Sequence, residues 1–195
     1  VTVKIASQPT DNTWIEKEAK ILTQFKDAKS GSSLFAIKKT VPEILDTFLI
    51  SGVGGKRFLV TVTRHRAGLV SVADVIKAYP DGLDPIDAGW IGRRIIAQTL
   101  AASMVGVTHC AILPDHVLVD PITRDPYHIG WTHSLLDSKN GSGRITHVID
   151  RYKEYYPPEV FDKKPPSHCT DLYMAGKNLI KLFGGDTKTN VLPKS

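Results

Sequence analysis

The sequence predicts an α+β fold with a small, β-rich N-terminal part and a mostly helical C-terminal part. Up to residue 66, short runs of alternating apolar residues, which are typical of strands, surround one segment with helical periodicity. Beyond residue 66, segments with helical periodicity dominate, and two short apolar strands interrupt them. We therefore divide the chain into residues 1–66 and residues 67–195.

The composition is that of a soluble globular protein. The chain has 195 residues, of which 42% are hydrophobic and 23% are charged, enough to bury a core in one domain or two small lobes. No apolar run approaches the roughly 20 residues of a membrane span, and the start lacks a signal-peptide pattern. These features predict a cytoplasmic protein that does not enter a membrane.

Charge and cysteine usage exclude some classes of function. The net charge is +5, but the lysines are spread out and the densest basic patch, Arg64-His65-Arg66, is short. Without an arginine-rich arm or zinc-finger spacing, nucleic-acid binding is disfavoured. Cys110 and Cys169 form no CxxC pair, so we expect two reduced thiols rather than a disulfide or a structural zinc site.

The first strand and the first helix carry the charged residues of most interest. Val1, Val3 and Ile5 alternate with polar residues, which predicts a half-buried strand with Lys4 on the face opposite the valines. A turn at residues 9–12 and a helix from Thr13 to Phe25 follow. Its inward positions recur at helical spacing: Ile15, Ala19, Leu22 and Phe25. Glu18 lies on the same inward stripe.

A hairpin completes the N-terminal part. After a polar turn at residues 29–33, strands are expected from Glu43 to Ile50 and from Phe58 to Thr63, joined by a glycine-rich turn at residues 51–56. The run Val53-Gly54-Gly55-Lys56 lacks the GxxxxGK[ST] spacing and opens no helix, so it does not predict a phosphate loop. Glycine there supplies the positive φ angles of a tight turn.

The C-terminal part is predicted to be mostly helical. Helices are expected from Val72 to Ala78 and from Asp87 to Val105, separated by a turn at residues 80–82. The longer helix should carry four apolar residues inward: Ile91, Ile95, Leu100 and Met104. Strands from Val117 to Val119 and from His128 to Trp131 should pair around a turn at residues 120–126.

The remaining segments are a loop, a helix and a tail. Proline and charge predict an extended loop from Tyr155 to Lys164. A helix from Asp171 to Phe183 carries Leu172, Ala175, Leu179 and Leu182 at helical intervals and ends at Gly184-Gly185. Residues 186–195 are expected to be loose.

Short motifs along this order of elements resemble those of protein kinases. Val1-Thr2-Val3-Lys4 is similar to the VAIK strand, and Glu18 stands where the following helix of that family carries its glutamate. In the family this lysine and glutamate pair, and the lysine holds nucleotide phosphates. A carboxylate on an apolar face also needs a cation on physical grounds, although an ordinary surface pair would satisfy the same pattern.

Residues 107–119 resemble the kinase catalytic loop, whose usual form is HRDLKPENxL. His109 and Pro114 match this form. Ala111 replaces the aspartate that accepts the substrate proton, Leu113 replaces the lysine that steadies the phosphate, and His116 replaces the metal-binding asparagine.

Three further motifs follow in the order of that family. In the place of xDFG stands Ile129-Gly130-Trp131-Thr132, so Gly130 replaces the magnesium-binding aspartate. Tyr156-Pro157-Pro158-Glu159 resembles APE, and Asp171 stands where the central helix of the large lobe begins. The resemblance implies that Asp171 binds backbone amides around His109, and that Glu159 lacks its usual arginine.

The resemblance implies a protein kinase-like bilobal fold that has lost catalysis. Residues 1–66 would be an N-lobe without an evident glycine-rich loop, and residues 67–195 a C-lobe truncated after its central helix. Without the base and both metal ligands, phosphoryl transfer loses the groups that lower its barrier. We expect no catalytic residue and a pseudokinase that acts as a protein-binding scaffold or regulatory module, with an unidentified protein partner. The alternatives are a metal-independent nucleotide sensor and an atypical ATP-dependent kinase.

The resemblance also implies a degenerate nucleotide cleft, with ATP as the candidate ligand. Its residues would be Lys4, Glu18, Leu118 and Ile129. Thr2 takes the place of the alanine above the adenine, where its larger polar side chain would crowd the roof.

Other clusters are better explained by packing. The histidines and nearby ligand types match no zinc spacing, so no metal site is predicted: His109, Cys110, Asp115, His116, His128 and His133. Asp120 and Asp125 each precede a proline in a turn, where aspartate is common for local hydrogen bonding. We expect His109 to be buried in a loop, and Trp14 and Trp131 to be packing residues.

Overall fold

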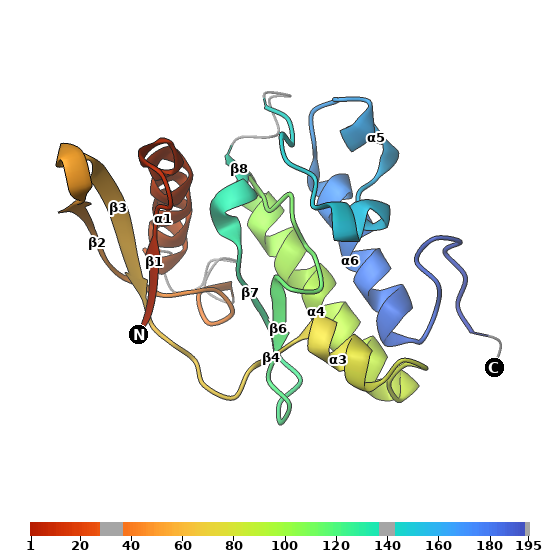
Figure 1. Ribbon diagram of the computed structural model, residues 1–195. Helices are drawn as coiled ribbons and strands as arrows, with labels where there is room; N and C mark the ends of the chain where they lie inside the picture. The colour runs from red at the N-terminus through yellow and green to blue at the C-terminus, as the bar shows by residue number, and fades with distance from the viewer. Residues whose placement is uncertain (28–36, 137–142, 194–195) are drawn as a thin grey trace.

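A small sheet with one long helix lies beside a larger, mostly helical part (Figure 1). The computed structural model describes residues 1–27, 37–136 and 143–193. The architecture is mixed α/β with small antiparallel sheets, in agreement with the predicted α+β class. The chain crosses from the sheet part to the helical part after residue 63 (Figure 1).

The sheet part follows the predicted order of elements. It consists of β1 (Thr2–Ile5), α1 (Asn12–Lys26), β2 (Ile44–Ser51) and β3 (Arg57–Thr63), with 3-10 turns at Pro9–Asp11 and Val53–Gly55. The antiparallel strands lie in the order β1-β3-β2. Gly54 and Gly55 have φ values of 70° and 72°, which confirms the hairpin turn. The polar turn predicted at residues 29–33 lies outside the described residues.

The predicted half-burial of the first strand is wrong. Val3 and Ile5 are each 52% exposed, although Lys4 does face away from them as expected. Directly paired residues share a face, so Ile5 and Phe48 flank Val60 on the outer side of the sheet. Helix α1 lies against the other side, where Lys4 meets Glu18, so among the described residues it leaves the apolar side chains of β1 exposed, while Val60 in the central strand is buried.

Helix α1 joins the two parts through its apolar stripe. All four predicted inward residues are buried, as is Glu18. The ring of Phe25, near the end of the helix, meets the ring of Trp131 edge to face, with centroids 4.9 Å apart. A pair of this kind adds directional stabilisation to the area that it buries. Trp131 is therefore a packing residue as predicted, whereas Trp14 is 38% exposed.

The helical part is built around two long antiparallel neighbours, α4 and α6. Its elements are β4 (Val70–Ser71), α3 (Val72–Ala78), α4 (Pro85–Met104), β5 (Val107–Thr108), β6 (Val117–Val119), β7 (Pro126–His128), β8 (Leu135–Leu136), α5 (Pro158–Phe161) and α6 (His168–Leu182), with 3-10 turns at Trp131–His133 and Asp150–Tyr155. Local caps explain where the helices begin. The side chains of Ser71, Asp84 and Ser167 accept hydrogen bonds from the first backbone N–H groups of α3, α4 and α6.

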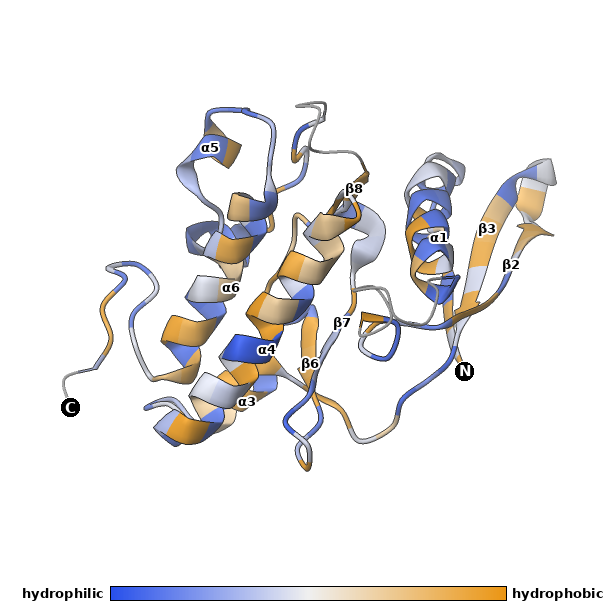
Figure 2. Cartoon of the chain, turned by 180° about the vertical axis from the view of Figure 1, so that it is seen from behind, coloured by the Kyte–Doolittle hydropathy of each residue, from blue (hydrophilic) through white to orange (hydrophobic). Residues whose placement is uncertain are grey.

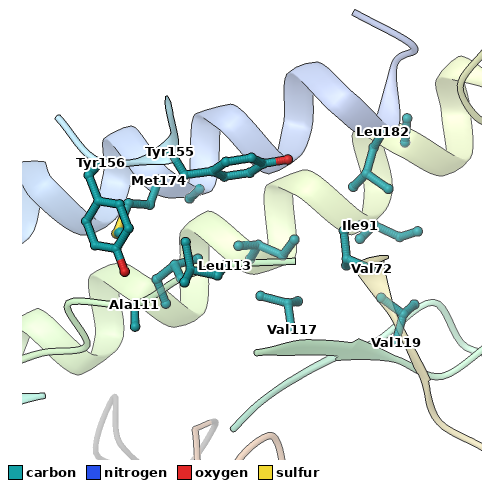
Figure 3. Close-up of a cluster of buried hydrophobic side chains, with 14 of the residues drawn as sticks. Val72, Ile91, Ala111, Leu113, Val117, Val119, Tyr155, Tyr156, Met174 and Leu182 are labelled. Atoms are coloured by element: carbon teal, nitrogen blue, oxygen red, sulfur yellow. The ribbon is translucent and has the colours of Figure 1, made fainter. Parts of the chain in front are cut away.

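The larger core lies between α4, α6 and β6. Figure 3 shows Ile91, Leu113, Val117, Met174 and Leu182 converging there from these elements and from the segment before β6. Figure 2 shows the molecule from behind, and apolar and polar bands alternate along α4 and α6. This pattern is that of amphipathic helices. Among the helices of the described residues, none is both long enough and apolar enough to cross a membrane.

Two of the four residues predicted inward on α4 are exposed. Ile91 and Ile95 are buried, but Leu100 is 40% and Met104 62% exposed. At about 100° per residue, Met104 lies on the side of the helix opposite Ile95, and the buried stripe continues through Thr99 instead. Hydrophobicity alone therefore misassigned the last turns of the helix.

Three other segments depart from the prediction. The strand expected at residues 128–131 lies at Pro126–His128, and a 3-10 turn follows it. The expected loop at residues 155–164 contains the short helix α5, which Pro158 begins with a φ angle suited to a first helical position. The expected loose tail folds back, because Asp186 pairs with Val191 and Thr187 is buried.

The turn before α4 packs tightly on the end of α6. Gly82 has a φ of 96°, and a Cβ there would lie 2.5 Å from Gly184 N and from Phe183 C. The Leu83 N–H donates to Leu182 O at 2.8 Å. Two backbone segments therefore meet without room for a side chain.

Gly82→Ala should destabilise the protein more than Gly68→Ala. Gly68 has a similar φ of 80° but open space around it, so alanine there has only the backbone strain, about 1 to 2 kcal/mol. At Gly82 the clash should add about 1 to 3 kcal/mol. Denaturant unfolding of both variants measures the difference, and equal losses would refute the close packing of the turn on α6.

Candidate functional site

A cavity of about 450 Å³ lies between the sheet and the helical part. All four residues predicted to form a cleft line it, namely Lys4, Glu18, Leu118 and Ile129. They come from β1, α1, β6 and the residue that follows β7. The structure thus brings the predicted residues together, while the ligand of the cavity stays a prediction.

An ion pair closes one side of the cavity. Lys4 Nζ donates to Glu18 Oε2 at 2.6 Å, and Glu18 is only 5% exposed. A carboxylate removed from water needs such a partner, because desolvation opposes its charge. Among the described residues that line the cavity, Glu18 is the single carboxylate. The ammonium group of Lys4 remains partly exposed and can also reach an anion in the cavity.

Apolar side chains also line the cavity. Leu22 of α1, Leu118 and Ile129 line the cavity from different elements. Thr2, expected to crowd the roof, lies within hydrogen-bond distance of His65, with 3.2 Å between its Oγ1 and the ring Nδ1. This contact links β1 to the segment of residues 64–66, where the chain crosses between the two parts beside the cavity.

A short basic segment borders the cavity where the chain crosses between the two parts. Arg64, His65 and Arg66 all line it. The guanidinium of Arg66 lies over the ring of Tyr127, 5.1 Å from its centroid, and donates to Lys39 O at 2.7 Å. This side of the cavity is therefore cationic and partly ordered by stacking.

The loop of residues 109–116 is held against α6 by two buried polar side chains. Asp171 accepts hydrogen bonds from the backbone N–H groups of His109 and Cys110, at 2.5 and 2.8 Å. Asn178 donates to Ile112 O at 2.8 Å. Cys110 has a φ of 64°, a costly conformation for a residue with a side chain. The bonds from Asp171 therefore fix a strained turn, and the predicted contact of Asp171 is confirmed.

Burial shifts the protonation of Asp171. Desolvation raises the pKa of its carboxyl group to about 7, while the two backbone N–H donors act in the opposite direction. The group therefore titrates near neutral pH in the folded protein.

Two histidine rings of this loop, His109 and His116, lie near a third at the end of β7, His128. His109 is buried as predicted, and its Nε2 lies 3.0 Å from Ile129 O. The ring centroids of His116 and His128 lie 6.3 and 6.1 Å from the ring centroid of His109. Burial lowers the pKa of His128 to about 3, so this ring is neutral at physiological pH. Within the part of the chain that the structure describes, no three histidine, cysteine or acidic side chains converge as metal ligands.

His116 contacts two other positions singled out in the sequence, Gly130 and the backbone oxygen of Ala111. The His116 Nδ1 lies 2.9 Å from Ala111 O, and a Cβ at Gly130 would lie 2.8 Å from the His116 ring. Burial lowers the pKa of His116, so the ring is neutral there. An uncharged imidazole thus occupies the space between Ala111 and Gly130.

Three further aspartates discussed in the sequence analysis form contacts elsewhere. Asp115 pairs with Arg151, and Asp125 pairs with Arg94. Asp120 accepts hydrogen bonds from two backbone N–H groups of its own turn, as expected of a turn residue. None of these three is among the described residues that line the cavity.

Sequence reasoning missed the roles of Tyr127, Asn178 and Arg66. Tyr127 lines the cavity and carries the stacked Arg66, but its neighbours in the sequence gave no periodic signal. Asn178 lies on the buried side of α6, where a polar residue among apolar ones is a signal for a buried hydrogen bond.

Two smaller expectations concern the cysteines and Glu159. Cys110 and Cys169 are both free thiols, as predicted. Glu159 accepts a hydrogen bond from Thr170 Oγ1 at 3.1 Å, so its carboxylate binds the first turn of α6.

Comparison with known proteins found no family model that matches the chain. No curated protein matches it either. Function is therefore inferred from the residues and their geometry.

The contact between His116 and Gly130 predicts energetic coupling. Gly130→Ala should destabilise the protein strongly, and His116→Ala should relieve the steric part of this loss, giving a coupling energy of about 1 to 2 kcal/mol in a double-mutant cycle. The backbone strain at φ 81° is the same in both backgrounds and cancels. A cycle with Gly54→Ala, where nothing lies within 4 Å, is the control and should show no coupling.

Asp171→Asn should change how stability depends on pH. Because the folded pKa is raised, from 3.8 to about 7, the carboxyl group contributes stability below about pH 4 that is lost as the pH rises to about 7. The advantage of the unchanged protein over the variant should therefore shrink across this range in urea unfolding.

Asp186→Asn is the control for this pH dependence. Backbone hydrogen bonds lower the pKa of Asp186, so its effect on stability should be constant above about pH 4.5. An advantage at Asp171 that is constant or grows with pH would contradict the assignment.

Proposed function

We propose that the chain is a pseudokinase, a kinase-like fold without phosphoryl transfer, that acts as a regulatory module by binding a nucleotide without a metal ion. The observation that carries the proposal is that the ring of His116 lines the cavity against Gly130, within hydrogen-bond distance of the backbone oxygen of Ala111. In a protein kinase the corresponding positions hold the base and both metal ligands. Here these positions hold an alanine, a neutral imidazole and a glycine, which supports the loss of catalysis.

The cavity between the two parts is not filled by side chains, which supports the binding of a ligand there. Its volume of about 450 Å³ falls within the range of small-molecule sites, and both apolar and cationic side chains line it. Leu118 and Ile129 offer apolar surface to a base, whereas Lys4 offers a charge to a phosphate. Since the lining carboxylate Glu18 is already paired with Lys4, we propose binding of ATP without a divalent cation.

The exposed outer face of the sheet supports a second role as a protein-binding scaffold. Val3, Ile5, Phe48 and Ile50 share this face and are each more than one third exposed. Clusters of exposed apolar side chains often mark contact surfaces. A protein partner at this face and a cytoplasmic location are parts of the proposal that rest on these exposed residues and on composition.

ATP should bind the purified chain equally well with EDTA and with Mg²⁺. The double variant Lys4→Met/Glu18→Gln removes both charges at similar size, and should weaken ATP about tenfold while adenosine binding changes little. Leu118→Trp should fill the cavity and weaken both ligands. Isothermal calorimetry measures each affinity, with exposed Lys20→Met as the control.

Two outcomes would contradict the proposal. The nucleotide role fails if neither ATP nor adenosine binds, or if binding requires Mg²⁺. The loss of catalysis fails if the chain transfers labelled phosphate from ATP and Lys4→Met/Glu18→Gln abolishes the transfer.

A further inference from the structure

A second cavity, of about 430 Å³, adjoins the first at the crossing segment. The two cavities share Arg64, Arg66 and Tyr127 in their linings. Lys38 and Lys39 line the second cavity but not the first. The basic segment Arg64-His65-Arg66, which is too short to predict nucleic-acid binding, therefore lies between two hollows of ligand size.

The charges around this second cavity do not balance. Four cationic side chains and one carboxylate, Glu43, line it among the described residues. Arg64 Nε donates to Glu43 Oε2 at 2.6 Å, and this bond holds the pKa of Glu43 below its usual value. Glu43 is therefore ionised and already neutralised by Arg64. In the part of the chain that the structure describes, no ion pair joins Lys38, Lys39 or Arg66 to a carboxylate.

Arg66 is positioned without a carboxylate partner among the described residues. One of its nitrogens donates to the neutral carbonyl of Lys39, and its planar group lies over the Tyr127 ring. A guanidinium held in this way keeps further N–H donors for a second partner. Since a carbonyl and a ring fix its orientation, binding an anion has a smaller ordering cost than for a free side chain.

We propose that the cavity between Lys38, Lys39 and Arg66 binds a phosphate group of a small molecule. The geometry fits a multiply charged anion, because an oriented guanidinium and two lysines converge on one hollow. The phosphate belongs either to a nucleotide that extends from the first cavity or to a separate phosphorylated compound. The inference does not rest on nucleotide binding in the first cavity.

Inorganic pyrophosphate is the probe, because it carries the charge without a base. It should bind the full chain in calorimetry without metal ions, with an affinity that falls as salt rises. Lys38→Gln/Lys39→Gln should weaken it about tenfold or more, since charge-assisted hydrogen bonds are lost. Arg66→Lys should also weaken it, because lysine lacks the planar fork that stacks on Tyr127.

The control is Lys20→Gln/Lys77→Gln, which removes the same charge from exposed lysines that line neither cavity. It should leave pyrophosphate binding nearly unchanged. The proposal is overturned if pyrophosphate does not bind the unchanged chain, or if both double variants weaken it equally.

ATP and adenosine then separate the two sources of the phosphate. If Lys38→Gln/Lys39→Gln weakens ATP but not adenosine, one nucleotide spans both cavities. If that variant weakens pyrophosphate alone, a separate compound uses the second cavity, and the site is still supported. If pyrophosphate binds but neither adenosine nor ATP does, the proposed nucleotide role of the first cavity is refuted. The inference about the second cavity then still holds.

Discussion

Two backbone N–H groups, those of His109 and Cys110, donate to the buried carboxyl group of Asp171. This contact fixes the loop before β6 on α6 and holds Cys110 in its left-handed conformation. Asn178, also on α6, donates to Ile112 O and fixes the next part of the same loop. The loop has no regular secondary structure, so these bonds, together with those within the loop, hold its path and with it the position of the ring at residue 116. The site on one side of the loop therefore depends on polar groups buried on its other side.

His116 contacts both Gly130 and the backbone of Ala111. Its ring lies within hydrogen-bond distance of Ala111 O and fills the space beside Gly130, so a side chain at position 130 requires the ring to move. The ring is also neutral, because burial lowers its pKa. A single substitution toward a charged residue at Gly130 would therefore face a steric cost before it gained any ligand. The predicted coupling would therefore make the cost of a change at Gly130 depend on the residue at position 116.

Periodicity predicted the long elements well, because burial of a stripe dominates their formation. Helices α1, α3 and α6 were located within a few residues, and Lys4, Glu18, Leu118 and Ile129 do meet in one cavity. The exposure of Val3 was not predictable, since alternation shows which residues share a face but not whether another layer covers it. Tyr127 and Arg66 meet only through the tertiary fold, so no local pattern indicated their contact.

The shared wall makes the two cavities electrostatically dependent on each other. Arg64, Arg66 and Tyr127 line both, so an anion in one cavity reduces the positive potential that the other offers. Two separate anions would therefore bind with negative coupling, and by linkage each would weaken the other by the same factor. A single ligand that spans both cavities would avoid this repulsion and gain from both sets of cations. If both proposed sites bind phosphate groups, their shared cations would thus favour one extended ligand over two independent ones.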